Sequence, residues 1–169
     1  KTNKNVDFWI SYSYRGTQRY FLSYPFAIEP AFASKHTASL VLKKFVTKMK
    51  TQGTASYTYA TGRPYYNIND DNISGKYKIF DEGRTKDYNS LSLSLNYLPS
   101  LGKPKSKAFT VIVLSLTNVL GANNIYSYNY SANGQNKVAV TPPSHRFLYL
   151  GCVISLGIDR PEDAIDSHL

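Results

Sequence analysis

Hydrophobic and polar residues alternate strictly along Tyr88–Tyr97, which has the sequence YNSLSLSLNY. Leu91, Leu93 and Leu95 fall on one face, and small uncharged residues occupy the other. Successive side chains of an extended strand leave opposite faces of the sheet, so this alternation predicts a β-strand. The outer face of a soluble strand usually carries charged residues, whereas here serines stand opposite leucines. The pattern indicates a strand with lipid on one side and a wet, crowded interior on the other.

Similar patterns along the chain predict six strands in all. Most of them have about the 9–11 residues that cross a bilayer at a tilt. The alternation is poorest in the second segment, whose apolar residues also fit a short helix. The fifth segment is apolar on both faces, which predicts that its inner side is covered. The six predicted strands are Val6–Tyr14, His36–Val46, Thr54–Thr61, Tyr88–Tyr97, Ala108–Val119 and Arg146–Ile158.

Short and long connections alternate between these strands. The short ones are a turn around Lys50–Gly53 and a link of about ten residues after Tyr97 that is rich in proline and glycine. The long ones each run about 20 residues or more, which is rare for structureless loops of soluble domains. They are Gly16–Lys35, Gly62–Asp87 and Gly121–His145. Outer-membrane barrels combine short periplasmic turns with long external loops, so the alternation predicts a membrane barrel.

Six strands do not close such a barrel. Lipid offers no hydrogen-bond partner to an open sheet edge, and bacterial single-chain barrels have eight or more strands. We therefore expect two or more strands ahead of Lys1, or several chains that share one barrel. The predicted fold class is all-β: an antiparallel transmembrane β-barrel of which this fragment supplies about six C-terminal strands. Residues 1–158 would belong to the barrel, and residues 159–169 would form a periplasmic C-terminal tail.

The chain of 169 residues carries a net charge of +9, which raises the question of nucleic acid. Its basic residues sit at connections rather than in a stripe, and no nucleic-acid motif accompanies them, so we expect no nucleic-acid partner. An anionic membrane surface or acidic ligands explain the charge equally well. The 15 tyrosines suit strand ends at a membrane–water boundary, where the ring is buried and the hydroxyl stays wet. The single cysteine, Cys152, excludes an internal disulfide.

Catalytic and metal chemistry find little support in the sequence. His36, His145 and His168 are far apart, without a nucleophile elbow or a histidine pair at metal spacing, and we expect solvated histidines in loops and a tail. The segment Asn67–Asn72 (NINDDN) offers oxygen ligands, but asparagine and aspartate are ordinary turn residues. We expect no catalytic site, no metal site and no cofactor. A small enzyme barrel stays an alternative, because triads form in space rather than along the sequence.

Five residues in two external loops are candidates for ligand binding. Tyrosine supplies flat contact area, and arginine pairs with anionic groups. The alternative is structural: the Gly-Arg-Pro sequence forms a turn, and the tyrosines belong to an aromatic girdle at the strand ends. The candidates are Arg63, Tyr65, Tyr66, Tyr126 and Tyr128.

Three ordered stretches resemble the C-terminal end of TonB-dependent outer-membrane receptors of the Bacteroidota type. The segment ASYTYATGRPYYN (Ala55–Asn67) resembles a strand that ends in Tyr-x-Tyr and enters an external loop through Thr-Gly-Arg-Pro-Tyr. The segment LSLTNVLGANNIYSYNYS (Leu114–Ser131) resembles the penultimate strand, with its Asn-Val-Leu-Gly element, and SHRFLYLGCVISLGID (Ser144–Asp159) resembles the closing strand. The stretches FWISYSY and FASKHTASLVLKKF match the two preceding strands, so the resemblance covers nearly the whole chain.

This resemblance implies a 22-stranded barrel with an N-terminal plug in the outer membrane of a Gram-negative bacterium. Such a receptor takes up a scarce nutrient, for example a siderophore, vitamin, glycan or peptide, by active transport. Its partners would be outer-membrane lipid, the nutrient, a lid-like surface lipoprotein, and the TonB complex reached through the N-terminal region. One departure is that about eleven mostly polar residues follow the closing strand, where the family often ends in an aromatic residue. The alternative from another class is a soluble or cell-surface tyrosine-rich β-sandwich that acts as a binding module.

Overall fold

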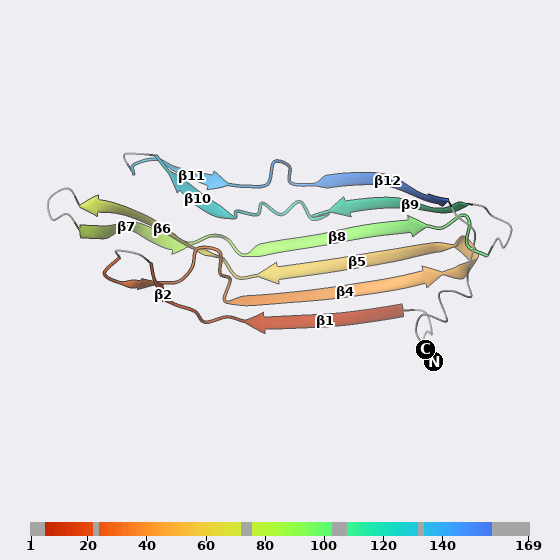
Figure 1. The fold of residues 1–169 in the computed structure, drawn as a ribbon, viewed down its shortest axis with the longest axis horizontal. Coiled ribbons are helices and arrows are strands. Elements are labelled where there is room, and N and C mark those ends of the chain that lie inside the picture. Colours follow the sequence, from red (N-terminus) through yellow and green to blue (C-terminus); the bar gives the residue numbers. More distant parts are fainter. Residues whose placement is uncertain (1–5, 22–23, 72–75, 103–107, 132–133, 157–169) are drawn as a thin grey trace.

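Six antiparallel strands lie side by side in one sheet, in the order β1-β4-β5-β8-β9-β12 (Figure 1). This computed structural model describes residues 6–21, 24–71, 76–102, 108–131 and 134–156. Each strand pairs with the next long strand along the chain, so the sheet is a meander. The six strands are β1 (Val6–Tyr14), β4 (His36–Val46), β5 (Thr51–Ala60), β8 (Tyr88–Tyr97), β9 (Ala108–Thr117) and β12 (Phe147–Leu156).

All six predicted strands are confirmed, three of them with the bounds that the alternation predicts. Strands β1, β4 and β8 match residue for residue, which rules out the helix alternative for the second segment. Strand β5 begins earlier than expected, and β9 ends earlier. The last two residues of the sixth predicted strand and the predicted tail at 159–169 lie outside the described residues.

The predicted short turn joins β4 to β5, but it lies three residues earlier than Lys50–Gly53, at Thr47–Lys50. The chain turns in the 3₁₀ helix η1 (Thr47–Met49) and at Lys50, whose φ of 51° is left-handed. The Lys50 N–H donates to the Thr47 carbonyl over 3.1 Å, and β5 starts with the next residue. Gly53 is an ordinary strand residue opposite Lys44 and Leu95. Its glycine suggested a turn, but the left-handed position falls on a lysine.

The long connections are not structureless, because each contains a short two-stranded sheet. These hairpins pair β2 (Arg19–Tyr20) with β3 (Ala27–Ile28), β6 (Pro64–Asp71) with β7 (Lys76–Arg84), and β10 (Ser127–Tyr130) with β11 (Lys137–Val140). All three extend from one end of the six-stranded sheet, which we call the hairpin end (Figure 1). The short connections leave from the opposite end, the turn end. The predicted alternation of short and long connections therefore corresponds to two different ends of one sheet.

The register aligns one set of apolar side chains from all six strands on one face, which we call the leucine face; β9 and β12 carry apolar residues on the other face as well. One row across it runs Phe8, Leu42, Ala55, Leu93, Leu116 and Leu148. The adjacent row on the opposite, polar face contains Trp9, Val41, Ser56 and Ser92. Directly opposite residues point to the same side of a sheet, so the two faces of β8 continue across its neighbours, of which β9 is apolar on both faces.

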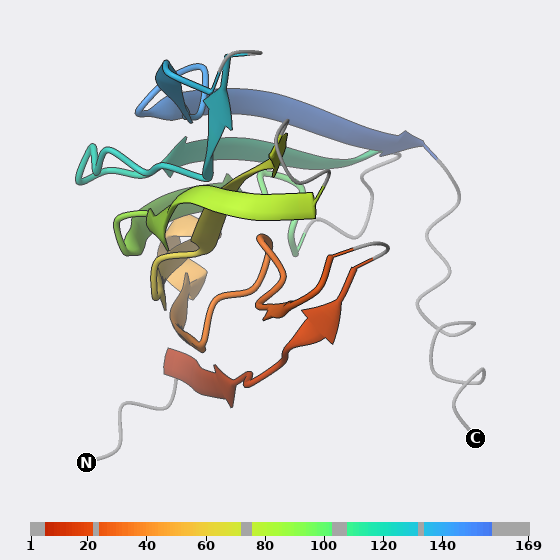
Figure 2. The same ribbon diagram turned by 90° about the vertical axis from the view of Figure 1, so that its left-hand side faces the viewer.

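No second layer covers either face in the part of the chain that the structure describes. The only apolar side chains buried there are the small ones of Pro30, Ala33 and Pro64, and Phe8 and Leu150 are 67% and 72% exposed. Figure 2 shows a single bent layer with β1 and β12 at separate edges. Within the described residues, β1 pairs only with β4, and β12 pairs only with β9, so the sheet does not close. None of the described residues forms a helix long and apolar enough to span a membrane.

Candidate functional site

The hairpin end of the sheet is fastened by hydrogen bonds between side chains and backbone. The Gly62 N–H donates to Asp87 Oδ1 over 2.9 Å, and the Tyr59 hydroxyl donates to Asp87 Oδ2 over 2.6 Å. The bond from Tyr59, followed by the one from Gly62, holds the pKa of the Asp87 carboxyl below its usual value. Both carboxylate oxygens of Asp87 are thus engaged in joining β5 to the start of β8.

Arg63 is fixed by reciprocal hydrogen bonds with Thr85. Its N–H donates to Thr85 Oγ1 over 2.9 Å, and the Thr85 N–H donates to the Arg63 carbonyl over 2.9 Å. Thr85 is only 6% exposed. A Cβ at Gly62 would lie 1.9 Å from the Thr85 carbonyl oxygen, so the backbone here requires glycine. The backbone of the Thr-Gly-Arg-Pro sequence, which connects β5 to β6, is therefore held in one conformation.

A cavity of about 330 Å³ lies at this junction, over the polar face of the sheet. Three basic residues line it: Arg15, Arg63 and Lys86. Three aromatic residues also line it: Phe32, Tyr88 and Tyr126. Small hydroxyl residues make up much of the remainder: Ser13, Ser34, Thr37, Thr58, Thr61 and Thr85. No acidic residue contributes to the lining, so the cavity is rich in hydrogen-bond donors and positive charge.

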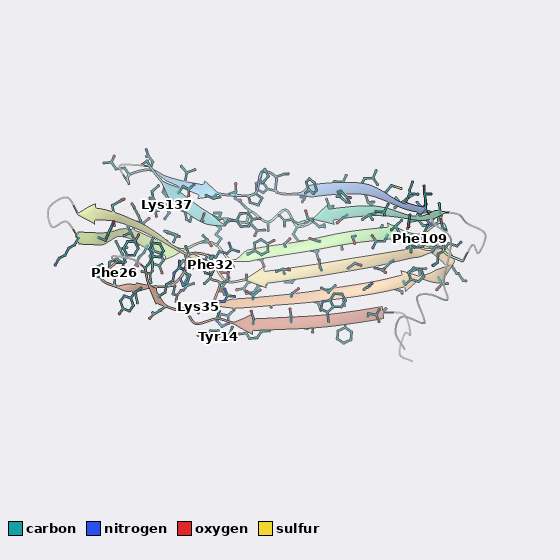
Figure 3. The ribbon with its side chains drawn as sticks, viewed as in Figure 1. Tyr14, Phe26, Phe32, Lys35, Phe109 and Lys137 are labelled. Atoms are coloured by element: carbon teal, nitrogen blue, oxygen red, sulfur yellow. The ribbon has the colours of Figure 1, made fainter. Side chains whose placement is uncertain are left out.

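The backbone around this cavity is held in place by the strand ends. The Arg15 N–H donates to the Lys35 carbonyl over 2.8 Å, just beyond β1. The His36 N–H donates to Thr61 Oγ1 over 3.1 Å, and the Thr61 N–H donates to the His36 carbonyl over 3.0 Å. Figure 3 shows Tyr14, Phe32 and Lys35 at this junction between the sheet and the hairpins. A site built on strand ends is more rigid than one on a free loop.

A second cluster surrounds Lys137 and links the hairpin β6–β7 to the hairpin β10–β11. The Lys137 ammonium lies 3.8 Å from the centre of the Tyr65 ring and 4.5 Å from that of Tyr128. These two rings meet edge to face with centroids 4.7 Å apart. Lys137 Nζ also lies 3.0 Å from Asp81 Oδ2, and the Tyr130 hydroxyl donates to the same oxygen over 2.5 Å. We call this set the lysine cage.

The lysine cage shifts the pKa values of its members. Burial, together with the hydrogen bond to Asp81, raises the pKa of Tyr130 to about 12. The hydrogen bonds from Tyr130 and then Lys137 lower the pKa of the Asp81 carboxyl. Burial alone would lower the pKa of Lys137, but its contacts with Tyr65 and Asp81 outweigh burial, so this pKa is raised. The charges of the cage are therefore mutually satisfied.

Glu29 forms the centre of a third cluster. It pairs with Lys35 over 2.9 Å and with Arg84, and Arg84 Nη1 also donates to the Gly62 carbonyl over 3.0 Å. The hydrogen bond from Lys35, more than that from Arg84, lowers the pKa of Glu29. Tyr66 lines a neighbouring hollow of about 410 Å³, and burial raises the pKa of its hydroxyl. This cluster braces the hairpin β2–β3 against β6–β7.

The five predicted ligand-binding residues thus fall in three places. Arg63 and Tyr126 line the cavity, whereas Tyr65 and Tyr128 belong to the lysine cage and Tyr66 to the hollow beside Glu29. The other two basic residues of the cavity, Arg15 and Lys86, went unpredicted. Both lie next to a strand at the hairpin end, but sequence position alone does not reveal where their side chains point. Lys137 went unpredicted for the same reason.

The expectation that His36 lies in a loop is wrong. His36 is the first residue of β4, its Nδ1 lies 2.7 Å from the Tyr12 hydroxyl, and its ring centroid lies 5.1 Å from that of Tyr14. His145 is exposed in a loop, and His168 lies outside the described residues.

Residues Asn67–Asp71 of the segment NINDDN belong to strand β6 rather than to a turn, and its last residue, Asn72, lies outside the described residues. The Asn67 amide donates to the Gly134 carbonyl over 3.1 Å, so it joins two hairpins. Within the described residues, no group of three His, Cys, Asp or Glu side chains is placed to hold a metal ion. Cys152 lies exposed on the leucine face, opposite Ile112.

Comparison of the chain with protein-family models, with curated proteins and with solved structures finds no match. The function must therefore be argued from the geometry of the sheet and of the cavity.

Proposed function

We propose that this chain forms part of the wall of a TonB-dependent outer-membrane receptor that takes up a scarce nutrient by active transport. The observation that carries the proposal is the leucine face, which is apolar across all six strands and has no covering layer in the described residues. Soluble monomers rarely expose apolar patches larger than a few hundred Å². Burying one leucine side chain is worth about 1.5–3 kcal/mol, so a face of this size needs an apolar partner such as lipid. Large exposed members are Phe8, Ile10, Leu42, Leu93, Leu95, Leu114, Leu148, Leu150 and Ile154.

Tyrosines at the hairpin end of the leucine face support the same proposal. The register places Tyr12 and Tyr59 in one row across the sheet, beyond the leucines, with Tyr57 in the next row. The Tyr57 hydroxyl donates to Asn89 Oδ1 over 2.7 Å, and that of Tyr59 donates to Asp87. Rings at the edge of an apolar band, with hydroxyls bonded to polar groups beyond it, match the aromatic girdle of outer-membrane barrels.

The opposite face suits a wet interior. Ser56, Ser92 and Ser94 lie on it, and all three are partly buried. Lys44 is on the leucine face, close to the turn end, where a long side chain reaches water from an apolar band. The sheet therefore combines a lipid-compatible face with one that carries small residues on β5 and β8, where it tolerates a plug or solvent, and larger apolar residues such as Phe109 and Val153 on β9 and β12.

The outer edges of β1 and β12 have no partner strand among the described residues, and in the proposed barrel they require closure by further strands, since lipid cannot satisfy them. In the proposed barrel of 22 strands, strands outside the chain pair with both edges. A plug and the segment that contacts the TonB complex lie upstream, and the hairpins face outward to capture the nutrient, with a surface lipoprotein as a further partner. The role is transport without a catalytic step or cofactor.

The test is the solvent that the complete protein requires. A barrel wall is insoluble in plain buffer and becomes folded and monodisperse in detergent, which size-exclusion chromatography and circular dichroism measure. A folded, monodisperse monomer in plain buffer would contradict the proposal and favour a soluble tyrosine-rich β-sandwich, in which a second sheet covers the leucine face. The sequence encoded upstream is a second check, since a receptor requires a plug and many more alternating strands there.

A further inference from the structure

We propose that the cavity at the hairpin end binds a small organic oxyanion, carrying phosphate or carboxylate groups, through Arg15, Arg63 and Lys86. This inference rests on the proposed function, because it names the class of ligand that the external hairpins would capture. The cavity has about 330 Å³, the lower end of the range for small-molecule sites. A molecule the size of a sugar phosphate or a tricarboxylate fits this volume.

The basic residues of the cavity differ from their neighbours because no described residue is their counter-ion. Lys35 and Arg84 share Glu29, and Lys137 pairs with Asp81. Among the described residues, no acidic group lies within salt-bridge distance of Arg15, Arg63 or Lys86. Asp87 follows Lys86 in the sequence, but its two carboxylate oxygens accept hydrogen bonds from the Tyr59 hydroxyl and the Gly62 N–H. Three cations facing one cavity repel each other unless an anion joins them.

The remaining lining suits the body of such a ligand. Ser13, Thr37 and Thr58 lie on the polar face of the neighbouring strands β1, β4 and β5. Ser13 is directly opposite Thr37, and Thr58 lies close to this pair. They offer hydrogen bonds to further oxygen atoms. The Tyr88 and Tyr126 rings are nearly parallel, with an interplanar angle of 23° and centroids 6.4 Å apart, and they add flat apolar surface to the wall. The cavity therefore matches a hydroxylated molecule with an anionic end.

Arg63 is the best-positioned of the three cations. The Arg63 N–H and carbonyl both form hydrogen bonds with Thr85, and the preceding position has no room for a side chain larger than that of Gly62. Arginine pairs with carboxylate and phosphate through two parallel hydrogen bonds, which lysine cannot reproduce. We therefore expect Arg63 to contribute most to affinity, with Arg15 and Lys86 adding charge.

The experiment measures binding of four probes to the complete protein by isothermal titration calorimetry: glucose 6-phosphate, citrate, glucuronate and glucose. We expect the multiply charged probes to bind more tightly than glucuronate, and glucose to bind weakest. Tight binding of only glucose 6-phosphate would assign a phosphate ligand, and tight binding of only citrate and glucuronate a carboxylate. Raising the salt concentration should weaken binding. Equal binding of glucose and glucose 6-phosphate, or binding of none of the probes, would overturn the inference.

Variants assign the binding to the cavity. Arg63→Gln should weaken binding of the preferred anion about tenfold or more, and Arg63→Lys should restore part of it. Lys86→Gln should weaken binding by a smaller factor. The matched control is Lys48→Gln, since Lys48 is an exposed lysine at the turn end. Equal losses in Lys48→Gln and Lys86→Gln would overturn the inference. Anion binding through Arg63 in a protein that is monomeric in plain buffer would support the inference while refuting the membrane function.

Discussion

The six-stranded sheet and the hairpins beyond it are stabilised in different ways. Among the described residues, all three ion pairs and every cation–π contact involve residues of the hairpins or of the loops around them. The sheet is held together by backbone pairing between its strands, and its apolar face is uncovered within the described residues. Exposed ion pairs contribute little to stability, whereas an apolar face of this size is costly to leave in water. The contrast is what the proposed membrane setting predicts, with the hairpins in water and the leucine face against lipid.

The largest expected effect comes from placing a charge on each face at the middle of β8. Leu93→Arg should cost about 2–4 kcal/mol of unfolding free energy at the bilayer midplane, and Ser92→Arg should cost much less because it faces the interior. Denaturant unfolding of the complete protein in lipid vesicles measures both. The two residues are neighbours in one strand, so backbone effects are matched. Equal costs would contradict the assignment of the faces.

A smaller effect is expected from Asn118, which supports the hairpin end through its side chain. Its amide donates to the Ala122 and His145 carbonyls over 2.9 and 2.6 Å, and its oxygen accepts the Ala122 N–H over 3.1 Å. Asn118 also adopts a left-handed φ of 50°. Asn118→Ala leaves these partners unsatisfied and should cost about 1–3 kcal/mol of unfolding free energy.

The control for Asn118 is Asn123→Ala, because Asn123 is an exposed asparagine in the same loop. It should unfold at the same denaturant concentration as the wild type. A loss as large as that of Asn118→Ala would mean that the loop, rather than the Asn118 hydrogen bonds, determines the effect.

The smallest expected effects concern the lysine cage and pH. The folded-state pKa of Asp81 lies below its ordinary value of 3.8, so its stabilising contribution is full above that value and is lost as pH falls through the lowered pKa. The pKa of Tyr130 is raised from 10.0 to about 12, so its contribution is full below pH 10.0 and is lost as pH rises through about 12. The two hairpins should therefore stay joined across the neutral range and separate at either extreme.

An ultraviolet titration of the wild type against Tyr130→Phe isolates the Tyr130 hydroxyl. Asp81→Asn should lower the pKa of Tyr130 from about 12, but burial should keep it above 10.0. The control is Glu82→Gln, the next residue on the same strand, which should leave this pKa unchanged. A Tyr130 pKa that is insensitive to Asp81→Asn would show that the cage does not form in solution.

The same contrast explains how much of the fold could be predicted from the sequence. In β1 and β8 the two faces differ clearly in polarity, so alternation specifies the strands residue for residue, and β4 has its predicted bounds in spite of a poorer alternation. In the hairpin β6–β7, a polar segment such as NINDDN shows no such alternation. Its pairing is also shifted by an irregularity between Asn67 and Ile68. The hairpins consequently resembled plain loops.

The cavity was predictable only in part. Arg63 and Tyr126 could be chosen from their residue types at the mouths of loops. Arg15 and Lys86 could not, because their common cavity depends on where the backbone hydrogen bonds between Arg15 and Lys35 and between Thr85 and Arg63 place the chain beyond β1 and β7. Side-chain direction at a strand end is set by these few long-range bonds rather than by local periodicity.

The most direct test of the central claim, that the leucine face meets lipid, exchanges the positions of Phe8 and Trp9. Trp9 is the only tryptophan of the chain and lies on the polar face, whereas Phe8 lies on the leucine face. The measurement is fluorescence quenching by brominated lipid, in the complete protein in vesicles. Any tryptophan outside the 169 residues is replaced by phenylalanine. The double variant Phe8→Trp/Trp9→Phe should be quenched strongly and the native Trp9 only weakly. Equal quenching at the two positions, or stronger quenching of Trp9, would contradict the account.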